Sequence, residues 1–411
     1  VSASNVITAG AGIYNTTGTI SITGGNIKST GSNAAVHNVS GIVTMTDGSI
    51  STATGIGLSN ESLNDTSNVS GGTIDGASGV AISNTGVFEI KAGTIKSASN
   101  TVANIGTKTL KITGGTISSS ATVNKYAVVN NSTGIIQITN GNINTDCSGV
   151  YNNRGTLTIT GGNITGNGES GIAVANQTGI LTINGGKIVA NKGIGIANSS
   201  DLTSNISQTA SVEAKVGNAV VNNGIFEIKG GTIKSGSNAV VNSGAKTMTI
   251  NGGNISSTGT NLVAVYNAGS GRIDLNAGTI TSNGSGVVNN TGTVIVNGAN
   301  ISGITGSGVS NEAGNVDIIK GTISCAALGV KTMSGAITNI SGGTITAGTA
   351  STQGNAIMNT ETGKVTITGG NISTTQGIVM FNEGSGTIKV NNPTANINAG
   401  RFPVLFNKGS G

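Results

Sequence analysis

One short repeating unit fills the whole chain of 411 residues. It is easily seen as GTISITGGNI from Gly18, GTLTITGGNI from Gly155 and GKVTITGGNI from Gly363. The units are about 21 to 28 residues long, and about seventeen and a half of them follow one another. Repeats of this length are typical of architectures in which a unit buries its apolar face only against its neighbours. The chain is therefore predicted to have a single architecture rather than several unlike domains.

Within each unit the apolar residues alternate with polar ones, which predicts strands. A first aliphatic column recurs once per unit from Ile22 to Val390, and a second column of Ile or Val runs from Ile27 to Ile397. The two columns are usually five residues apart, which breaks the period of two and predicts a corner. A Gly pair lies between them, and Gly allows a positive φ or a close backbone approach at a tight bend.

A third segment reads apolar-x-apolar-x-Asn, as in Ile172, Val174 and Asn176. Stacked one coil above another, each Asn amide can donate to the next and accept from the last, which satisfies an inward polar group. One unit leaves Asn130 and Asn131 as alternatives, and another has Thr332 in place of Asn. The predicted structural ladder otherwise comprises Asn15, Asn38, Asn60, Asn84, Asn104, Asn152, Asn176, Asn198, Asn222, Asn242, Asn267, Asn289, Asn311, Asn359, Asn382 and Asn407.

Three strands, a Gly corner and an Asn corner describe one coil of an all-β fold, a parallel β-helix or β-solenoid. A coil of about 23 residues favours the right-handed, three-sheet form, with about 17 to 18 coils. Residues 1–411 are predicted to form one continuous solenoid. At roughly 4.8 Å per coil, this would be a rod on the order of 80 Å long.

Both ends of the sequence lie within the repeat. Val1 is in register with Ile22, so the sequence starts in the middle of a strand, and Asn407–Gly411 matches Asn267–Gly271. Neither end carries a recognisable cap, which solenoids need for solubility. Three explanations remain open: an excerpt from a longer array, identical subunits that pair head to tail through open strand edges, or a boundary with a Gly-Ser tail.

The GGNI, GGTI and GGKI elements followed by an apolar-x-Asn corner resemble the right-handed β-helical stalks of bacterial surface adhesins and autotransporter passengers. The architecture is also similar to the pectate-lyase-like β-helix, in which an Asn ladder occurs. The resemblance covers essentially the whole chain. It implies an extracellular location on a bacterial cell surface and a structural or adhesive role, with glycans or host and cell surfaces as partners.

Acidic residues are scattered along the chain. The best stacked pair, Asp274 and Asp317, shares an outward column but is separated by a coil that carries Ile295. The two carboxylates would be roughly 9 to 10 Å apart, with no neighbouring Arg and no sign of a cleft. We therefore expect no catalytic residues and no enzyme activity.

Metal and cofactor sites also lack sequence support. The single His, His37, cannot form a metal cluster and is expected on the surface, and the Gly-rich strings lack the Lys and following helix of a phosphate-binding loop. Cys147 and Cys325 lie about eight coils apart, too far for a disulfide, and are expected to be small packing residues. No metal ion, cofactor or other prosthetic group is expected.

Composition excludes two further classes of function. The net charge is +5, charged residues make up only 9%, and no basic run is present, so nucleic-acid binding is not expected. No apolar stretch reaches the roughly 18 residues of a membrane span.

The pairs Glu89 with Lys91 and Glu227 with Lys229 are expected to be solvated pairs on outward strand faces.

The leading functional hypothesis is a structural extracellular rod, either a cell-surface stalk or adhesin segment or a subunit of a head-to-tail filament. The first alternative is glycan binding along the Asn- and Thr-rich faces. Ice binding, suggested by the threonine pairs Thr158/Thr160 and Thr366/Thr368, is less favoured, because the column of Thr158 and Thr366 also contains charged residues such as Glu89. A polysaccharide lyase is the least favoured.

Overall fold

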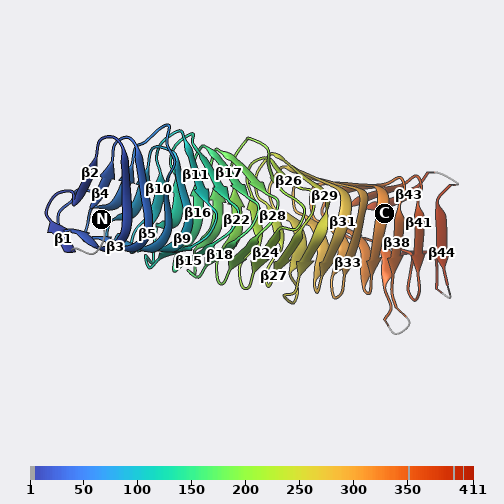
Figure 1. The fold of residues 1–411 in the computed structure, drawn as a ribbon. Helices are drawn as coiled ribbons and strands as arrows, with labels where there is room; N and C mark the ends of the chain where they lie inside the picture. The colour runs from blue at the N-terminus through green and yellow to red at the C-terminus, as the bar shows by residue number, and fades with distance from the viewer. Residues whose placement is uncertain (1–4, 350–351, 392–393, 401) are drawn as a thin grey trace. The chain divides into compact units, whose positions relative to one another are not determined.

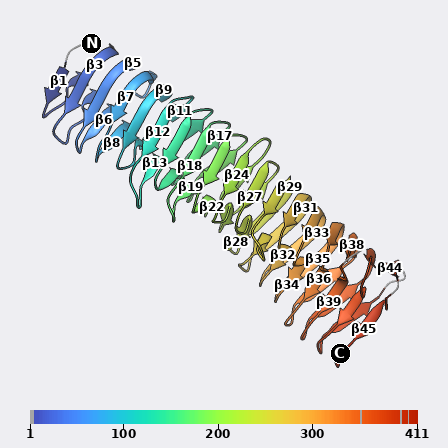
Figure 2. The ribbon, with the colours of Figure 1, turned by 90° about the horizontal axis from the view of Figure 1, so that it is seen from below.

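The computed structural model describes residues 5–349, 352–391, 394–400 and 402–411, and it divides into two compact units, Val1–Lys215 (unit 1) and Val216–Gly411 (unit 2). Each unit is a parallel β-solenoid, in which strands of successive turns lie side by side (Figures 1 and 2). None of the described residues is helical, so this part of the chain has no helix that could span a membrane. The predicted all-β solenoid is confirmed, while one continuous solenoid over residues 1–411 stays a prediction.

Unit 1 contains two sets of hydrogen-bonded strands. The set that carries the two aliphatic columns comprises β1 (Asn5–Thr8), β3 (Thr19–Ser29), β5 (Ile42–Thr52), β7 (Ser67–Asp75), β9 (Phe88–Ser97), β11 (Thr109–Ile112), β12 (Thr116–Ser119), β14 (Ile135–Ile138), β15 (Asn142–Thr145), β17 (Thr156–Ile159), β18 (Asn163–Gly166), β20 (Ile180–Ile183), β21 (Lys187–Ala190), β23 (Ser204–Ile206) and β24 (Ser211–Ala214). The set that ends in Asn comprises β2 (Ile13–Asn15), β4 (Val36–Asn38), β6 (Ile56–Asn60), β8 (Val80–Asn84), β10 (Val102–Asn104), β13 (Tyr126–Asn130), β16 (Ser148–Asn152), β19 (Ile172–Asn176) and β22 (Ile194–Asn198).

Unit 2 repeats this arrangement. Its first set comprises β26 (Phe226–Ile228), β27 (Thr232–Ser235), β29 (Thr247–Ser257), β31 (Arg272–Ser282), β33 (Thr293–Gly303), β35 (Asn315–Cys325), β37 (Ile337–Ile340), β38 (Thr344–Ala347), β40 (Lys364–Ile367), β41 (Asn371–Thr374), β43 (Thr387–Val390) and β44 (Asn396–Ala399). Its second set comprises β25 (Val220–Asn222), β28 (Val240–Asn242), β30 (Val263–Asn267), β32 (Ser285–Asn289), β34 (Ser307–Asn311), β36 (Leu328–Thr332), β39 (Asn355–Asn359), β42 (Met380–Asn382) and β45 (Leu405–Asn407).

The three predicted strand segments of a turn are present, and hydrogen bonding joins the first two into one bent sheet. A single strand such as β3 runs through the corner, and its pairing with β5 shifts register between Ile22 and Asn26. Elsewhere the two segments are separate strands, as in β17 and β18, which pair in parallel with β20 and β21. The corner therefore bends the sheet without ending the hydrogen bonding between turns.

Glycine is required at the corner for two physical reasons. The second Gly of the pair has a positive φ in every turn where the sequence predicted this bend, for example 74° at Gly72. A Cβ added to Gly72 would lie 2.6 Å from the carbonyl oxygen of Gly48 in the preceding turn. Side chains are therefore excluded both by backbone conformation and by the close approach of neighbouring turns.

The core of each unit is a narrow stack of aliphatic residues. Both predicted columns are buried in the described turns except near the last one, where Val390 is 44% exposed. In the Asn strands the second apolar residue, such as Leu58, is buried, whereas the first, such as Ile56, is only half-buried. The residue between them is small because a Cβ at Gly57 would lie 2.8 Å from Cγ2 of Ile74. This close packing explains why a core with few aromatic residues suffices.

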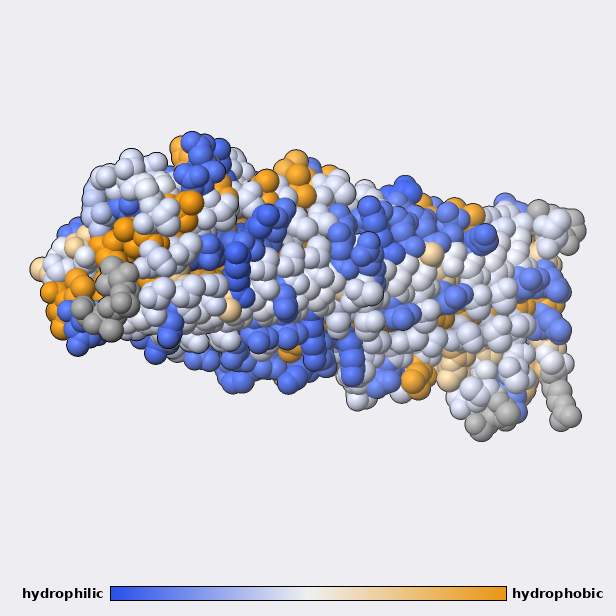
Figure 3. Space-filling model, in the orientation of Figure 1, coloured by the Kyte–Doolittle hydropathy of each residue, from blue (hydrophilic) through white to orange (hydrophobic). Residues whose placement is uncertain are grey.

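The outer surface carries small polar side chains. None of the residues that precede the second aliphatic column, from Asn26 to Asn371, is buried. Figure 3 shows that the visible face of each unit is mostly of intermediate hydropathy, with separate hydrophilic areas and small apolar ones. This column of mostly Ser, Thr and Asn residues therefore faces outward.

Candidate functional site

The Asn ladder is the most regular polar feature of the molecule. In unit 1 each Asn donates from Nδ2 to Oδ1 of the Asn in the following turn over 2.8 to 3.0 Å, in the order Asn15, Asn38, Asn60, Asn84, Asn104, Asn130, Asn152, Asn176 and Asn198. Asn130, and not Asn131, is therefore the ladder residue of its turn. All nine side chains are buried, and the ladder bonds satisfy amides that would otherwise be costly to bury.

Most ladder amides of unit 1 also hold the loop that follows their own strand. Asn152 Nδ2 donates to the carbonyl oxygen of Gly155 over 2.9 Å as well as to Asn176 Oδ1 over 2.8 Å. Asn176 does the same with Gly179 and Asn198. The ladder therefore fixes both the stacking of turns and the path of the chain out of the Asn strand.

In unit 2 the ladder is interrupted once in the described residues. Bonds of 2.8 to 3.0 Å join Asn222, Asn242, Asn267, Asn289 and Asn311 in one series and Asn359, Asn382 and Asn407 in another. Thr332 lies in register between Asn311 and Asn359, as predicted. Asn311 Nδ2 instead donates to Thr338 Oγ1 over 3.1 Å, and Thr338 shares a 2.8 Å hydrogen bond with Thr332. The buried Oδ1 of Asn359 is left without a partner.

Among the described residues, three inward hydroxyls that were not predicted bind ladder amides. Ser67, Ser204 and Thr338 are buried in a column that is otherwise mainly apolar. Ser204 Oγ accepts from Asn176 Nδ2 over 3.0 Å and from the backbone N–H of Leu181 over 3.2 Å, and Ser67 does the same for Asn38 and Val43. The signal in the sequence is a Ser or Thr two residues before the first aliphatic column.

The stacked acids Asp274 and Asp317 lie in register with Ile295 between them, as predicted. The expectation that no Arg lies near them is wrong, because Arg272 Nε lies 2.7 Å from Asp274 Oδ1. Arg272 and Asp274 are two residues apart on one strand, so both side chains point outward and can pair. Asp317 accepts from Asn339 Nδ2 over 2.9 Å. Each carboxylate thus has its own separate partner.

The other predicted charged residues also form local pairs. Glu89 lies 3.5 Å from Lys91, and Glu227 lies 3.2 Å from Lys229. His37 is outward-facing, as expected, and its Nε2 lies 2.8 Å from Glu61 Oε1. These pairs are partly exposed, and such surface pairs contribute little to stability. Within the described residues, no group of His, Cys, Asp and Glu side chains has the arrangement of a metal site.

The threonine pairs behave as the sequence suggested. Thr158 lies in register between Gln137 and Thr182, and Thr366 lies between Asn339 and Lys389. The rows of hydroxyl groups are therefore interrupted by longer polar and charged side chains.

Both cysteines are free and buried. Cys325 occupies a column of small inward residues in unit 2, and its Sγ accepts the backbone N–H of Gly303 over 3.4 Å. Burial raises the pKa of the Cys325 thiol to about 11, although the Gly303 N–H opposes this shift. A thiol held in the neutral form is a packing group and a poor nucleophile.

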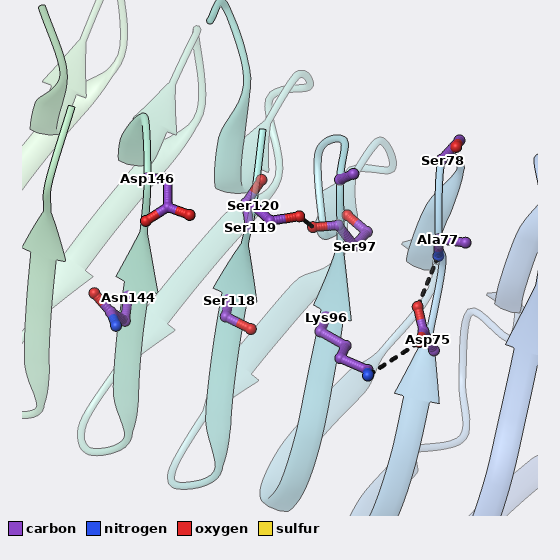
Figure 4. A pocket seen from close by; sticks show the side chains of 11 residues that line it. Asp75, Ala77, Ser78, Lys96, Ser97, Ser118, Ser119, Ser120, Asn144 and Asp146 are labelled. Atoms are coloured by element: carbon purple, nitrogen blue, oxygen red, sulfur yellow. Dashed lines mark hydrogen bonds and ion pairs between the residues drawn. The ribbon is translucent and has the colours of Figure 1, made fainter. Parts of the chain in front are cut away.

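A polar trough of about 520 Å³ lies on the outer surface of unit 1 and was not predicted. One wall consists of Asp75, Lys96, Ser118 and Asn144, which lie in register on the adjacent strands β7, β9, β12 and β15. The opposite wall comes from the loops after these strands and includes Ser120 and Asp146 (Figure 4). The trough was missed because its walls depend on loops of unequal length, which the strand pattern does not fix.

A smaller hollow of about 210 Å³ lies beside the loop that follows β12. It is lined in part by Tyr126 and Cys147. The ring of Tyr126 stacks on that of Tyr151, with centroids 4.6 Å apart. Burial, followed by the neighbouring Tyr151 and Cys147, raises the pKa of Tyr126 above its ordinary value.

Comparison with known proteins gives no relative for this chain: no family model matches, and neither the curated proteins nor the solved structures contain a match.

Proposed function

We propose that the chain is a structural segment of an extracellular protein on a bacterial surface, where stacked turns form a stalk. The observation that carries the proposal is the uniform internal construction of both units. Each has a thin aliphatic core, a row of bonded amides and an outer surface of small polar side chains. Such turns can be added without changing the cross-section, which suits a spacer and needs no catalytic group.

Contacts with further turns of the same kind are part of this proposal. In the last described turns, residues of the inward columns are exposed, with Val390 at 44% and Leu405 at 54%. Unpaired parallel strand edges are templates for additional strands. We propose that such edges are covered by more of the same repeat, from the same protein or from an identical subunit joined head to tail.

Negative-stain imaging of the purified chain tests the structural role. Immunogold labelling of intact cells that produce the chain tests its location. We expect elongated particles of even width and label on the outer surface. Compact globular particles, or label confined to the cell interior, would contradict the proposal. Sedimentation velocity over a range of concentrations tests whether identical subunits pair through their open strand edges. Such pairing predicts longer species as the concentration rises.

A second candidate function, glycan binding, is favoured by the polar trough in unit 1. It combines carboxylate, amide, ammonium and hydroxyl groups in one hollow. Ice binding and polysaccharide cleavage have no comparable observation in their favour.

A further inference from the structure

The polar trough follows the direction in which turns stack. Its wall residues Asp75, Lys96, Ser118 and Asn144 come from four adjacent strands. Three steps between turns correspond to roughly 14 Å along the stack. The trough therefore has the dimensions to take a short extended chain rather than a single small molecule.

Several groups in the trough are free to bind a ligand. Within the part of the chain that the structure describes, no protein group pairs with the carboxylate of Asp146, the hydroxyl of Ser118 or Nδ2 of Asn144. A carboxylate only accepts, an amide NH₂ only donates and a hydroxyl does both. A ligand that satisfies all three must itself both donate and accept at closely spaced positions, as the hydroxyl groups of sugars do.

Neighbouring contacts hold two of the wall residues, Asn144 and Asp75, in place. Asn167 Nδ2 donates to Asn144 Oδ1 over 3.1 Å, and Asn191 Nδ2 donates to Asn167 Oδ1 over 2.6 Å. This short outer row of amides leaves the NH₂ of Asn144 as the free end. Asp75 is fixed by the backbone N–H of Ala77 over 2.8 Å and by Lys96 Nζ over 3.2 Å, as Figure 4 shows. Groups oriented before binding lose less entropy when a ligand arrives.

The charge of the trough argues against an anionic ligand, and the hydrogen bonding of its strands argues against a peptide. The Asp75–Lys96 pair is neutral overall, so Asp146 leaves one uncompensated negative charge in the trough. An anionic ligand is therefore disfavoured. An extended peptide is also disfavoured, because peptides add to unpaired sheet edges, whereas the central strands β9 and β12 already pair on both sides.

We propose that this trough binds an uncharged oligosaccharide, with Ser118, Asn144 and Asp146 as its hydrogen-bonding residues. The proposal deepens the glycan-binding candidate above and is independent of the structural role. No aromatic side chain lines the trough, so binding depends on hydrogen bonds rather than on ring stacking, and one site alone binds weakly.

Isothermal titration calorimetry with the full chain tests the class of ligand. The probes are neutral hexasaccharides of glucose, galactose and mannose, together with the anionic hexamer of galacturonic acid. We expect at least one neutral probe to bind, and the galacturonic acid probe to bind at least about tenfold more weakly. If none of the neutral probes binds, both the trough as a binding site and the glycan-binding candidate are overturned. Tighter binding of the anionic probe would overturn the charge argument on which the proposal depends.

Variants then test the place of binding. The double variant Ser118→Ala with Asn144→Ala is expected to raise the Kd of the neutral probe about tenfold. Ser256→Ala is the matched control, because Ser256 holds the position of Ser118 on β29 in unit 2 and is equally half-buried. Far-UV circular dichroism checks that each variant is folded. An unchanged Kd in the folded double variant would overturn the trough as the site, while glycan binding by another face would still stand.

Discussion

Two stretches of the ladder differ in how well their amides are satisfied. Around Asn152 in unit 1, the amide donates to Asn176 and accepts from Asn130, so the row is complete on both sides. Around Thr332 in unit 2, the amide of Asn311 is diverted to Thr338, and Asn359 Oδ1 is buried without a partner. The two stretches have the same strand register, so the difference comes from the side chains alone.

This difference shows that an Asn in the ladder cannot be replaced by one hydroxyl residue. An Asn side chain offers two donors and an acceptor, whereas Thr offers a single donor. The turn therefore needs Thr338 as well as Thr332, and the pair still supplies no donor for Asn359. In this turn, one ladder Asn is thus replaced by two hydroxyl residues that lie in neighbouring columns, Thr332 and Thr338.

The largest loss of stability is expected from Asn152→Ala, in the uninterrupted stretch of the ladder in unit 1. It removes the acceptor of Asn130 and the donor for Asn176, which costs about 2 to 4 kcal/mol in the free energy of unfolding. Asn359→Ala is expected to cost about 1 kcal/mol less, because it also removes an acceptor that has no partner. Urea unfolding followed by far-UV circular dichroism measures both, and equal costs would contradict the comparison.

The interrupted stretch can be repaired by design. Thr338→Val alone is expected to destabilise the protein by about 2 kcal/mol, because it leaves the Thr332 hydroxyl without its side-chain partner and removes one acceptor of Asn311 Nδ2. Combining it with Thr332→Asn rebuilds the row through to Asn359 and is expected to recover this loss. Unfolding measurements on the two single variants and the double variant form a double-mutant cycle. A double variant as unstable as the sum of its parts would rule out the proposed pairing.

A smaller loss of stability is expected at Ser204, one of the two hydroxyls that support the ladder in unit 1. Ser204→Ala leaves the buried N–H of Leu181 without its acceptor, at a cost of about 1 to 2 kcal/mol. Ser59→Ala is the control, since Ser59 is an outward serine on β6, and is expected to change stability by less than about 0.5 kcal/mol. Hydrogen exchange at Leu181 reports the same loss locally, and unchanged protection there would contradict this role.

The smallest effect on stability is expected at Cys325, which lies at the end of β35, in the same turn as Thr332. Its pKa is about 11 in the folded chain against an ordinary value of 9.0, because burial disfavours the thiolate. Below pH 9 the thiol is neutral in both states, so its full contribution to stability is present. As pH rises from about 9 through about 11, only the unfolded state ionises, and stability is lost. Cys325→Ala is expected to remove this part of the pH dependence, and an identical pH profile in that variant would exclude Cys325 as its source.

Much of the fold could be predicted because backbone geometry repeats with the sequence. The columns from Ile22 and Ile27, the corner glycines and the amide row all recur at nearly constant spacing, so stacking in register follows directly. The choice between Asn130 and Asn131 could not be made, since both amides follow an alternating apolar pattern. The register of β13 with β16 and the ladder bonds of Asn130 settle it.

The trough could not be predicted for a different physical reason. It depends on which side chains meet across turns, and that depends on loop lengths that vary from turn to turn. Asp75 and Asp146 are far apart in sequence and are brought to one hollow only by three steps of strand pairing. The pairing of Arg272 with Asp274 needs no contact between turns, because the two residues lie two positions apart on one strand.

The most direct test of the account is a high-resolution crystal structure of the chain that shows the side chains of Asn130, Asn152 and Asn176. The account predicts one unbroken row, with each Nδ2 within hydrogen-bonding distance of the next Oδ1, at about 2.8 to 2.9 Å. Amides that point to solvent, or that lie in turns out of register with one another, would contradict it.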